Sequence, residues 1–109
     1  QLGSTAVNDR AVYCSTKGAL LSLARAMAID HAKQNIRVNT LSPGATETDR
    51  MTIRYGTMEE ARKAIGSHHI LGRLGLAEEM GRAALYLASD ASSFMTGADL
   101  VVDGGYNAW

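Results

Sequence analysis

Apolar residues recur at helical spacing over a long segment near the start of the chain. Small side chains are frequent in the same segment, which lets another backbone approach closely. We therefore expect one long helix from about Ala11 to Gln34, buried on more than one side by a sheet and by a neighbouring subunit. The positions that share its apolar face are Leu20, Leu23, Ala24, Met27 and Ala28.

Two short runs of apolar and β-branched residues predict strands. The first runs from Ile36 to Ser42 and is closed by Pro43-Gly44, and the second runs from Leu100 to Asp103 and stops at Gly104-Gly105. Helical segments separate the two runs, so they cannot form a tight hairpin. A crossover connection, and hence a parallel pair within an α/β sheet, is expected.

The segment between the strands contains two further helices. Residues 45–56 are polar and without a clear period, so we expect a loop or irregular short helices there. Thr57 and Glu60 have the spacing of a capping box, which predicts a short helix ending at Ile65. A further helix is expected from about Ala77 to Ser89, because its first turn is acidic and its apolar residues have helical period.

Two strands are too few for an independent sheet, and parallel sheets are buried on both faces. The missing strands must come from residues ahead of Gln1 or from another chain. The sequence begins at Gln1, without Met, in a small, polar, turn-like stretch. We therefore expect residues 1–109 to be the C-terminal part of one domain, cut from a longer protein.

Composition and charge narrow the class of partner. The chain has 109 residues, of which 46% are hydrophobic and 20% charged, as in ordinary globular proteins. Basic and acidic residues balance at 11 each, which favours neither a nucleic-acid nor a membrane-surface partner. The single cysteine, Cys14, fits a reducing compartment, and no run is long enough to span a membrane, so we expect a cytoplasmic protein.

Tyr13 and Lys17 are the residues that indicate chemistry. They are four positions apart on the predicted helix, so they project from the same face. A free tyrosine is a poor general base at neutral pH, but a neighbouring ammonium favours the phenolate. The pair could therefore transfer a proton during interconversion of an alcohol and a carbonyl. Without further context, the same spacing also describes a surface tyrosine beside a solvated lysine.

The surrounding motifs are Tyr13-Cys14-Ser15-Thr16-Lys17-Gly18-Ala19, Ile36-Arg37-Val38-Asn39, Pro43-Gly44-Ala45-Thr46-Glu47-Thr48, Thr96-Gly97-Ala98 and Asp103-Gly104-Gly105. Together they resemble the short-chain dehydrogenase/reductase family, and this resemblance favours the chemical interpretation of Tyr13 and Lys17. The motifs occur in the family's order over nearly the whole chain. This resemblance implies a Rossmann-type doubly wound parallel sheet, incomplete here, and an NAD- or NADP-dependent oxidoreductase acting on a small-molecule alcohol or carbonyl as a homo-oligomer, a dimer or tetramer.

The resemblance also implies roles for individual residues. Tyr13 is similar to the catalytic acid/base, and Lys17 to the residue that binds the nicotinamide ribose and makes that tyrosine more acidic. The turn at Pro43-Gly44, with Thr46 and Thr48, resembles the segment that holds the nicotinamide carboxamide and a nearby phosphate. No metal ligands are expected.

Two parts of the family's site are missing from the sequence. The serine that orients the substrate carbonyl falls just before Gln1, and Ser4 is too close to Tyr13 to be more than a weak substitute. No glycine-rich phosphate loop follows a predicted strand. We therefore expect the chain alone to bind cofactor poorly and to turn over little or nothing.

Other residues admit simpler interpretations. We interpret His68 and His69 as polar residues of the surface or of a substrate loop, because adjacent histidines on a helix diverge and no ligand partner has suitable spacing. Cys14 is interpreted as a small packing residue. Met51 and Met58 either line an apolar substrate pocket or pack the short helices. Residues 45–70 are where substrate choice would be encoded.

The leading hypothesis is hydride transfer, with Tyr13 as acid/base and Lys17 assisting it. The alternative is a non-catalytic fragment that can only self-associate, through the helix over residues 11–34 and the C-terminal strand with Tyr106 and Trp109. Hydrolysis by a serine and histidine has no nucleophile-elbow pattern to support it.

Overall fold

The computed structural model describes residues 1–108, and these contain four α-helices and two strands. In chain order they are α1 (Ala11–His31), β1 (Thr40–Pro43), α2 (Asp49–Tyr55), α3 (Met58–Ile65), α4 (Ala77–Ala88) and β2 (Asp99–Val102). Short 3₁₀ turns follow three of the helices, at Ala32–Gln34, Gly66–His68 and Asp90–Ser92.

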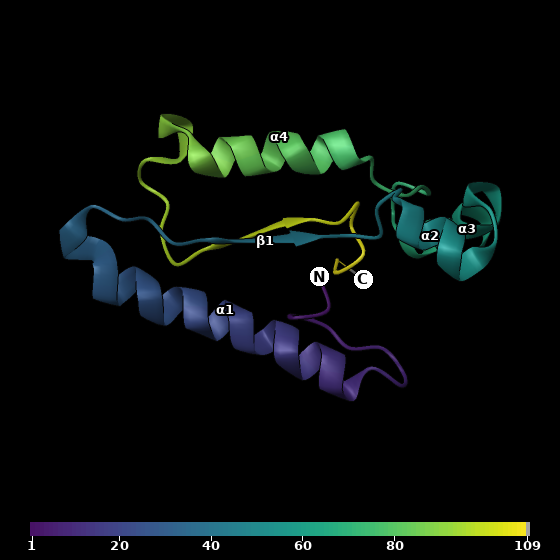
Figure 1. Ribbon diagram of the computed structural model, residues 1–109, viewed down its shortest axis with the longest axis horizontal. Coiled ribbons are helices and arrows are strands. Elements are labelled where there is room, and N and C mark those ends of the chain that lie inside the picture. Colours follow the sequence, from purple (N-terminus) through teal and green to yellow (C-terminus); the bar gives the residue numbers. More distant parts are fainter. Residues whose placement is uncertain (109) are drawn as a thin grey trace.

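The strands form the middle of three layers. β1 and β2 run parallel, with Thr40 opposite Asp99 and Pro43 opposite Val102. Figure 1 shows α1 on one side of this pair and α4 on the other, with α2 and α3 beyond the carboxyl ends of the strands. This arrangement confirms the α/β class and the parallel relation. In open α/β sheets, ligands bind at this end of the strands.

Helix α1 agrees with its predicted range, and its last turn tightens to 3₁₀ geometry. Asn35 ends it with a left-handed φ of 58°, a conformation that asparagine tolerates. Ala24 and Ala28 are its only buried residues within the described part of the chain. Leu20 and Leu23 remain 49% and 53% exposed, so the predicted burial on a second side is not seen in residues 1–108.

Strand β1 begins at Thr40, later than the predicted Ile36. The residues ahead of it are joined to the opposite segment by a backbone hydrogen bond, from the Gly97 N–H to the Val38 carbonyl at 2.7 Å, and by side-chain hydrogen bonds. Asn39 donates from Nδ2 to the Met95 carbonyl at 2.7 Å, and its Oδ1 accepts from the Ala98 N–H at 3.1 Å. The β-branched run was a correct signal for the strand, but its boundary depends on a partner segment distant in sequence.

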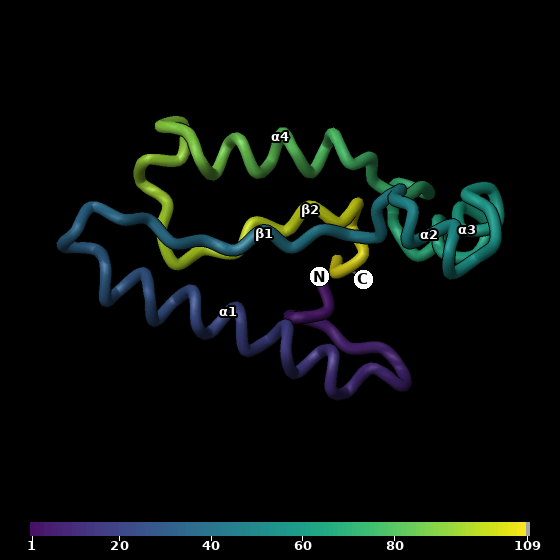
Figure 2. The backbone as a smooth tube through the Cα atoms, in the orientation of Figure 1, coloured from purple at the N-terminus to yellow at the C-terminus, as the bar shows by residue number. Residues whose placement is uncertain are grey.

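Strand β2 begins and ends one residue earlier than predicted. Asp103, the last residue of the predicted strand, belongs to the turn that follows β2. The Asp103 carboxylate is only 8% exposed and accepts from the backbone N–H groups of Gly105 and Asn107, each at 2.9 Å. These bonds reverse the chain directly after the strand. As Figure 2 shows, the C-terminal segment therefore returns to the place where the chain begins.

Both predicted short helices are present. The Thr57 hydroxyl accepts from the Glu60 N–H at 3.2 Å and caps α3, although the Glu60 carboxylate accepts from that hydroxyl and not from the Thr57 backbone. At α4, Glu79 accepts from the Leu76 N–H and binds Arg73 through both oxygens. The Arg73 hydrogen bonds, followed by the Leu76 bond, lower the pKa of Glu79 to about 2.

The described residues bury very little apolar surface. Their buried hydrophobic core consists of Ala24, Ala28, Ala61 and Leu74. The radius of gyration is 15.3 Å, whereas a compact domain of this length has a value of about 13 Å. Within residues 1–108 no helix is both long and apolar enough to cross a membrane. A two-stranded parallel sheet with so small a core agrees with the expectation of an incomplete domain.

Candidate active site

A cleft of about 760 Å³ opens at the carboxyl end of β1. Its walls come from the N-terminal segment, the first turns of α1, the end of β1, the loop into α2, and the turn after α3. All six residues singled out from the sequence line this cleft: Tyr13, Lys17, Pro43, Gly44, Thr46 and Thr48. The fold therefore brings together residues that are distant in sequence.

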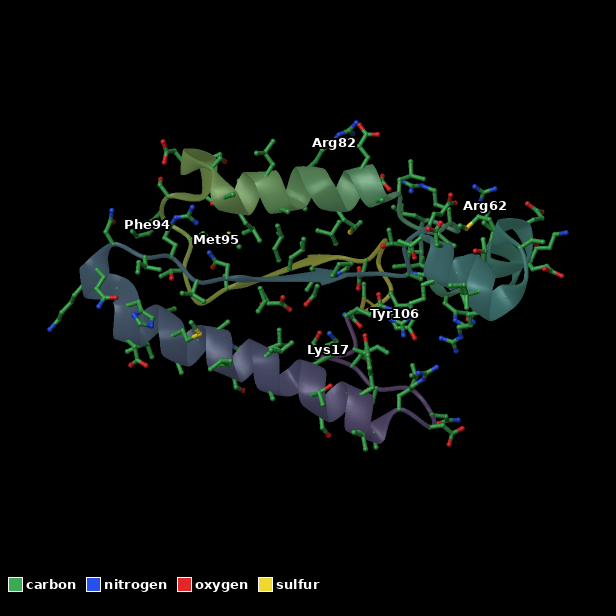
Figure 3. All side chains as sticks on the ribbon, in the orientation of Figure 1. Lys17, Arg62, Arg82, Phe94, Met95 and Tyr106 are labelled. Carbon is green, nitrogen blue, oxygen red and sulfur yellow. The ribbon has the colours of Figure 1, made fainter. Side chains whose placement is uncertain are left out.

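Tyr13 and Lys17 occupy the first two turns of α1. The Lys17 Nζ lies 5.4 Å from the centroid of the Tyr13 ring, within the range of a cation–π contact. Tyr13 is 37% exposed, and Lys17 is exposed with no ion pair among the described residues. In Figure 3, Lys17 lies between α1 and the strand ends, on the same side as Tyr106. Both polar groups are thus available to a ligand in the cleft.

The loop after β1 is fixed by backbone contacts. Gly44 donates to the Val102 carbonyl at 2.9 Å, and a Cβ at Gly44 would lie 2.7 Å from the Asp103 Cα. Only glycine fits at this point, because the obstructing atoms belong to the backbone. Farther along, the Gly75 N–H donates to the Ala45 carbonyl at 2.9 Å. The loop is consequently held to two neighbouring segments.

The two threonines of this loop differ in their freedom. The Thr46 hydroxyl donates to the Gly44 carbonyl at 3.0 Å, so it braces the turn. Thr48 precedes α2 and is exposed, and within residues 1–108 its side chain makes no hydrogen bond. Of the two hydroxyls, that of Thr48 is free to meet a ligand.

His69 is the residue that the sequence interpretation misplaced. It is 3% exposed, so the prediction of a surface residue is wrong for this position, although His69 does line the cleft. Its Nε2 accepts from the Ala45 N–H at 3.2 Å, and its Nδ1 then donates to the Ile65 carbonyl at 3.1 Å. Its Cβ also lies 3.4 Å from the position of a Cβ on Gly104. His69 therefore joins the loop after β1 to the end of α3.

No sequence signal identified this role, because the partners of His69 are set by the fold. The adjacent His68 is exposed and lines the cleft, as predicted for a polar residue there. Met51 lines the cleft as well, whereas Met58 does not. Ser4 is outside the cleft lining and donates to the Gln1 carbonyl at 3.1 Å.

The described residues fit a polar ligand in the cleft. Gln1 lines it, and the Gln1 Oε1 is buried without a hydrogen-bond partner within residues 1–108. The Lys17 ammonium and the Thr48 hydroxyl add donors that have no acceptor in this part of the chain. No group of three or more His, Cys, Asp or Glu side chains suited to a metal gathers in residues 1–108.

We predict that replacing His69 destabilises the loop. His69→Ala leaves the Ala45 N–H and the Ile65 carbonyl without partners, each at a cost of about 1–3 kcal/mol. Chemical denaturation of the longer protein expected from the sequence should show this loss of unfolding free energy. His68→Ala is the matched control, because that side chain is exposed. Equal stability of the two variants would contradict the assigned contacts.

Comparison with known proteins identifies the family. Residues 2–107 match the family described as enoyl-(acyl carrier protein) reductase. An uncharacterised oxidoreductase of Bacillus subtilis, YxbG, is 45% identical over 115 residues, covering 98% of this chain and 41% of the relative. The chain spans about two fifths of the length of the curated relatives that it matches.

Solved structures agree with the sequence matches. A short chain dehydrogenase family protein from Francisella tularensis has a TM-score of 0.89 and 31% identity, over 99% of this chain and 48% of that one. The 4-hydroxyisoleucine dehydrogenase complexed with NADH has a TM-score of 0.88 and 38% identity, over 99% of this chain and 44% of that one. A mutant of that dehydrogenase, complexed with NADH and succinate, matches equally well. This chain belongs to the short-chain dehydrogenase/reductase family.

Proposed function

We propose that this chain is the C-terminal part of an NAD- or NADP-dependent oxidoreductase, built as a single Rossmann-type domain. The reaction transfers a hydride between the nicotinamide and a carbon that carries a hydroxyl or carbonyl. The observation that carries the proposal is the shared cleft, in which Tyr13 and Lys17 line the same space as the Pro43–Thr48 segment. This space lies where α/β sheets bind their ligands.

The residues of the cleft suit the nicotinamide half of the cofactor. When bound, the cofactor supplies or accepts the hydride. The Lys17 ammonium is free to bind ribose hydroxyls, and the Thr48 hydroxyl is free to bind the carboxamide or a phosphate. Pro43, Gly44 and Thr46 shape the backbone that would hold the nicotinamide ring. The solved 4-hydroxyisoleucine dehydrogenase contains NADH, which supports this choice of cofactor.

Tyr13 is the proposed proton donor and acceptor for the substrate oxygen. During carbonyl reduction the carbon receives the hydride and the Tyr13 hydroxyl gives its proton to the oxygen, and in the oxidative direction both transfers reverse. The Lys17 ammonium stabilises the negative charge left on the Tyr13 oxygen. This separates the roles, because Tyr13 contacts the reacting oxygen while Lys17 acts on both the tyrosine and the ribose.

The remaining parts of the enzyme lie outside this sequence. We place the substrate-orienting serine just ahead of Gln1 and the phosphate-binding glycine loop farther upstream. The complete protein would act on a small-molecule alcohol or carbonyl in the cytoplasm and assemble as a dimer or tetramer. The fragment alone would be weakly active or inactive.

Replacing Tyr13 by phenylalanine in the complete enzyme tests the proton-transfer role. The variant keeps the ring but cannot exchange a proton, so kcat should fall by about 10²–10⁴-fold while the cofactor Kd changes little. Steady-state kinetics and a fluorescence titration with NADH or NADPH measure the two quantities. Tyr86→Phe, on α4 and outside the cleft lining, is the control. A Tyr13→Phe enzyme with an undiminished rate would refute the role.

The second candidate function is self-association without catalysis. Large apolar side chains of α1 are exposed, including Val12 at 79% and Ile29 at 78%, and Phe94 is fully open. Such surfaces favour burial against another copy. The C-terminal segment was also expected to contribute: Tyr106 is half-buried in the structure, and Trp109 lies outside the described residues.

Light scattering combined with a cofactor titration separates these readings of the 109-residue chain. We expect the isolated chain to associate with increasing concentration, because its apolar core is small, and to show no saturable binding of NADH or NADPH. Association alone agrees with both proposals. A monomer that binds either cofactor with low-micromolar affinity would contradict the expected dependence on upstream residues.

A further inference from the structure

The cleft carries an uncompensated positive charge. Of the chain's 11 basic residues, Arg10, Lys17, Arg50 and Arg54 line it. None of the 11 acidic residues does so. Within residues 1–108 these four cations form no ion pair. The basic residues that do form ion pairs are Arg62, Lys63, Arg73 and Arg82, all outside the cleft lining.

The two carboxylates of β2 and its following turn, Asp99 at the start of the strand and Asp103 just after its end, already accept hydrogen bonds. Asp99 accepts from the hydroxyls of Thr40 and Ser42 at 2.8 and 2.7 Å. Asp103 is buried, and its carboxylate accepts hydrogen bonds from two backbone N–H groups of its own turn. Neither side chain lines the cleft, and neither forms an ion pair with its arginines within residues 1–108. The cations therefore remain available to an anion that enters from solvent.

Helix α2 presents two of the arginines together. Arg50 and Arg54 are four positions apart, so they project from one face in neighbouring turns. The Arg54 guanidinium lies 5.2 Å from the centroid of the Tyr55 ring, and Tyr55 lines the cleft too. A planar guanidinium held in this way can bind both oxygens of a carboxylate.

Arg10 approaches from the other wall of the cleft. It is the N-cap residue of α1 and precedes Tyr13 by three positions. The positive charge is thus close in sequence to the residue proposed to transfer the proton. In Rossmann folds the cofactor pyrophosphate is bound at a glycine-rich turn after the first strand, which is absent from this sequence. Within the cleft a cofactor phosphate is placed at Thr48, so an anion beside Tyr13, the residue proposed to act on the reacting oxygen, is assigned to the substrate.

We propose that the substrate is a small hydroxy acid, or the matching oxo acid, whose carboxylate is bound by Arg50 and Arg54 with assistance from Arg10. This inference rests on the proposed oxidoreductase function. In the oxidative direction the hydroxyl-bearing carbon gives its hydride to NAD(P)⁺ and the hydroxyl gives its proton to Tyr13, which leaves the oxo acid. The carboxylate takes no part in the bond changes and fixes the orientation of the carbon chain. Apolar side chains of the cleft, such as Val7 and Met51, accommodate that chain.

The test compares charged and neutral substrates in the complete enzyme. Oxo acids of increasing chain length and the matching oxo amides are assayed by the oxidation of NADH and NADPH. The amides keep the ketone and the carbon chain but lack the charge. We expect kcat/KM for the best acid to exceed that of its amide by about 10–100-fold, as one or two charge-assisted hydrogen bonds would give.

Arginine variants then locate the effect. Arg50→Gln and Arg54→Gln should each raise KM for the acid by about tenfold. The KM for the amide and the Kd of the reduced cofactor should stay unchanged. Arg82→Gln is the matched control, because Arg82 pairs with Glu78 on α4, and in Figure 3 it projects from the side of that helix away from the strands. It should change neither KM nor Kd.

Two results would overturn the inference while leaving the oxidoreductase intact. One is equal turnover of acids and amides. The other is a loss of cofactor affinity in the Arg50 and Arg54 variants with the acid preference retained, which would assign these cations to the cofactor phosphates. An enzyme that binds neither cofactor and reduces none of the compounds would instead contradict the proposed function, and the substrate inference would fall with it.

Discussion

The close approach between Gly44 and the backbone of Asp103 sets the geometry on which the site depends. Because a Cβ on Gly44 would lie 2.7 Å from the Asp103 Cα, the two strands can end side by side only when this residue has no side chain. Their parallel register keeps both ends at one edge of the sheet. The chain after β1 then leads into α2, while the chain after β2 reverses its direction at the turn that begins with Asp103.

The other contacts of the site follow from that edge. His69 is buried between the loop after β1 and the turn after β2, and its two ring nitrogens bind Ala45 and Ile65. The segment around Gly75 holds the loop from the other direction. Against this fixed wall, α1 presents Tyr13 and Lys17 from its first turns. The cleft therefore lies where separate segments meet. Its basic residues come from more than one element, namely the start of α1 and helix α2.

Sequence patterns were sufficient for features that depend on neighbours along the chain. The helix α1 and the Thr57 cap are local, and each appears in the structure, whereas Pro43, predicted to close the strand as part of a turn, is the last residue of β1. The start of β1 was misjudged, since Asn39 uses its side chain to bind a segment distant in sequence. The burial of His69 and the presence of Arg10 and Arg54 in the lining of one cleft were missed for the same reason. Their partners become neighbours only after the strands have paired.

The central claim is that the nicotinamide lies between Tyr13 and the Pro43–Thr48 segment. A crystal structure of the complete enzyme with bound NADH or NADPH measures this directly. The account predicts the nicotinamide ring against that segment, with the Lys17 Nζ about 2.7–3.2 Å from a ribose hydroxyl. A cofactor bound so that neither Tyr13 nor Lys17 contacts its nicotinamide half would contradict the account.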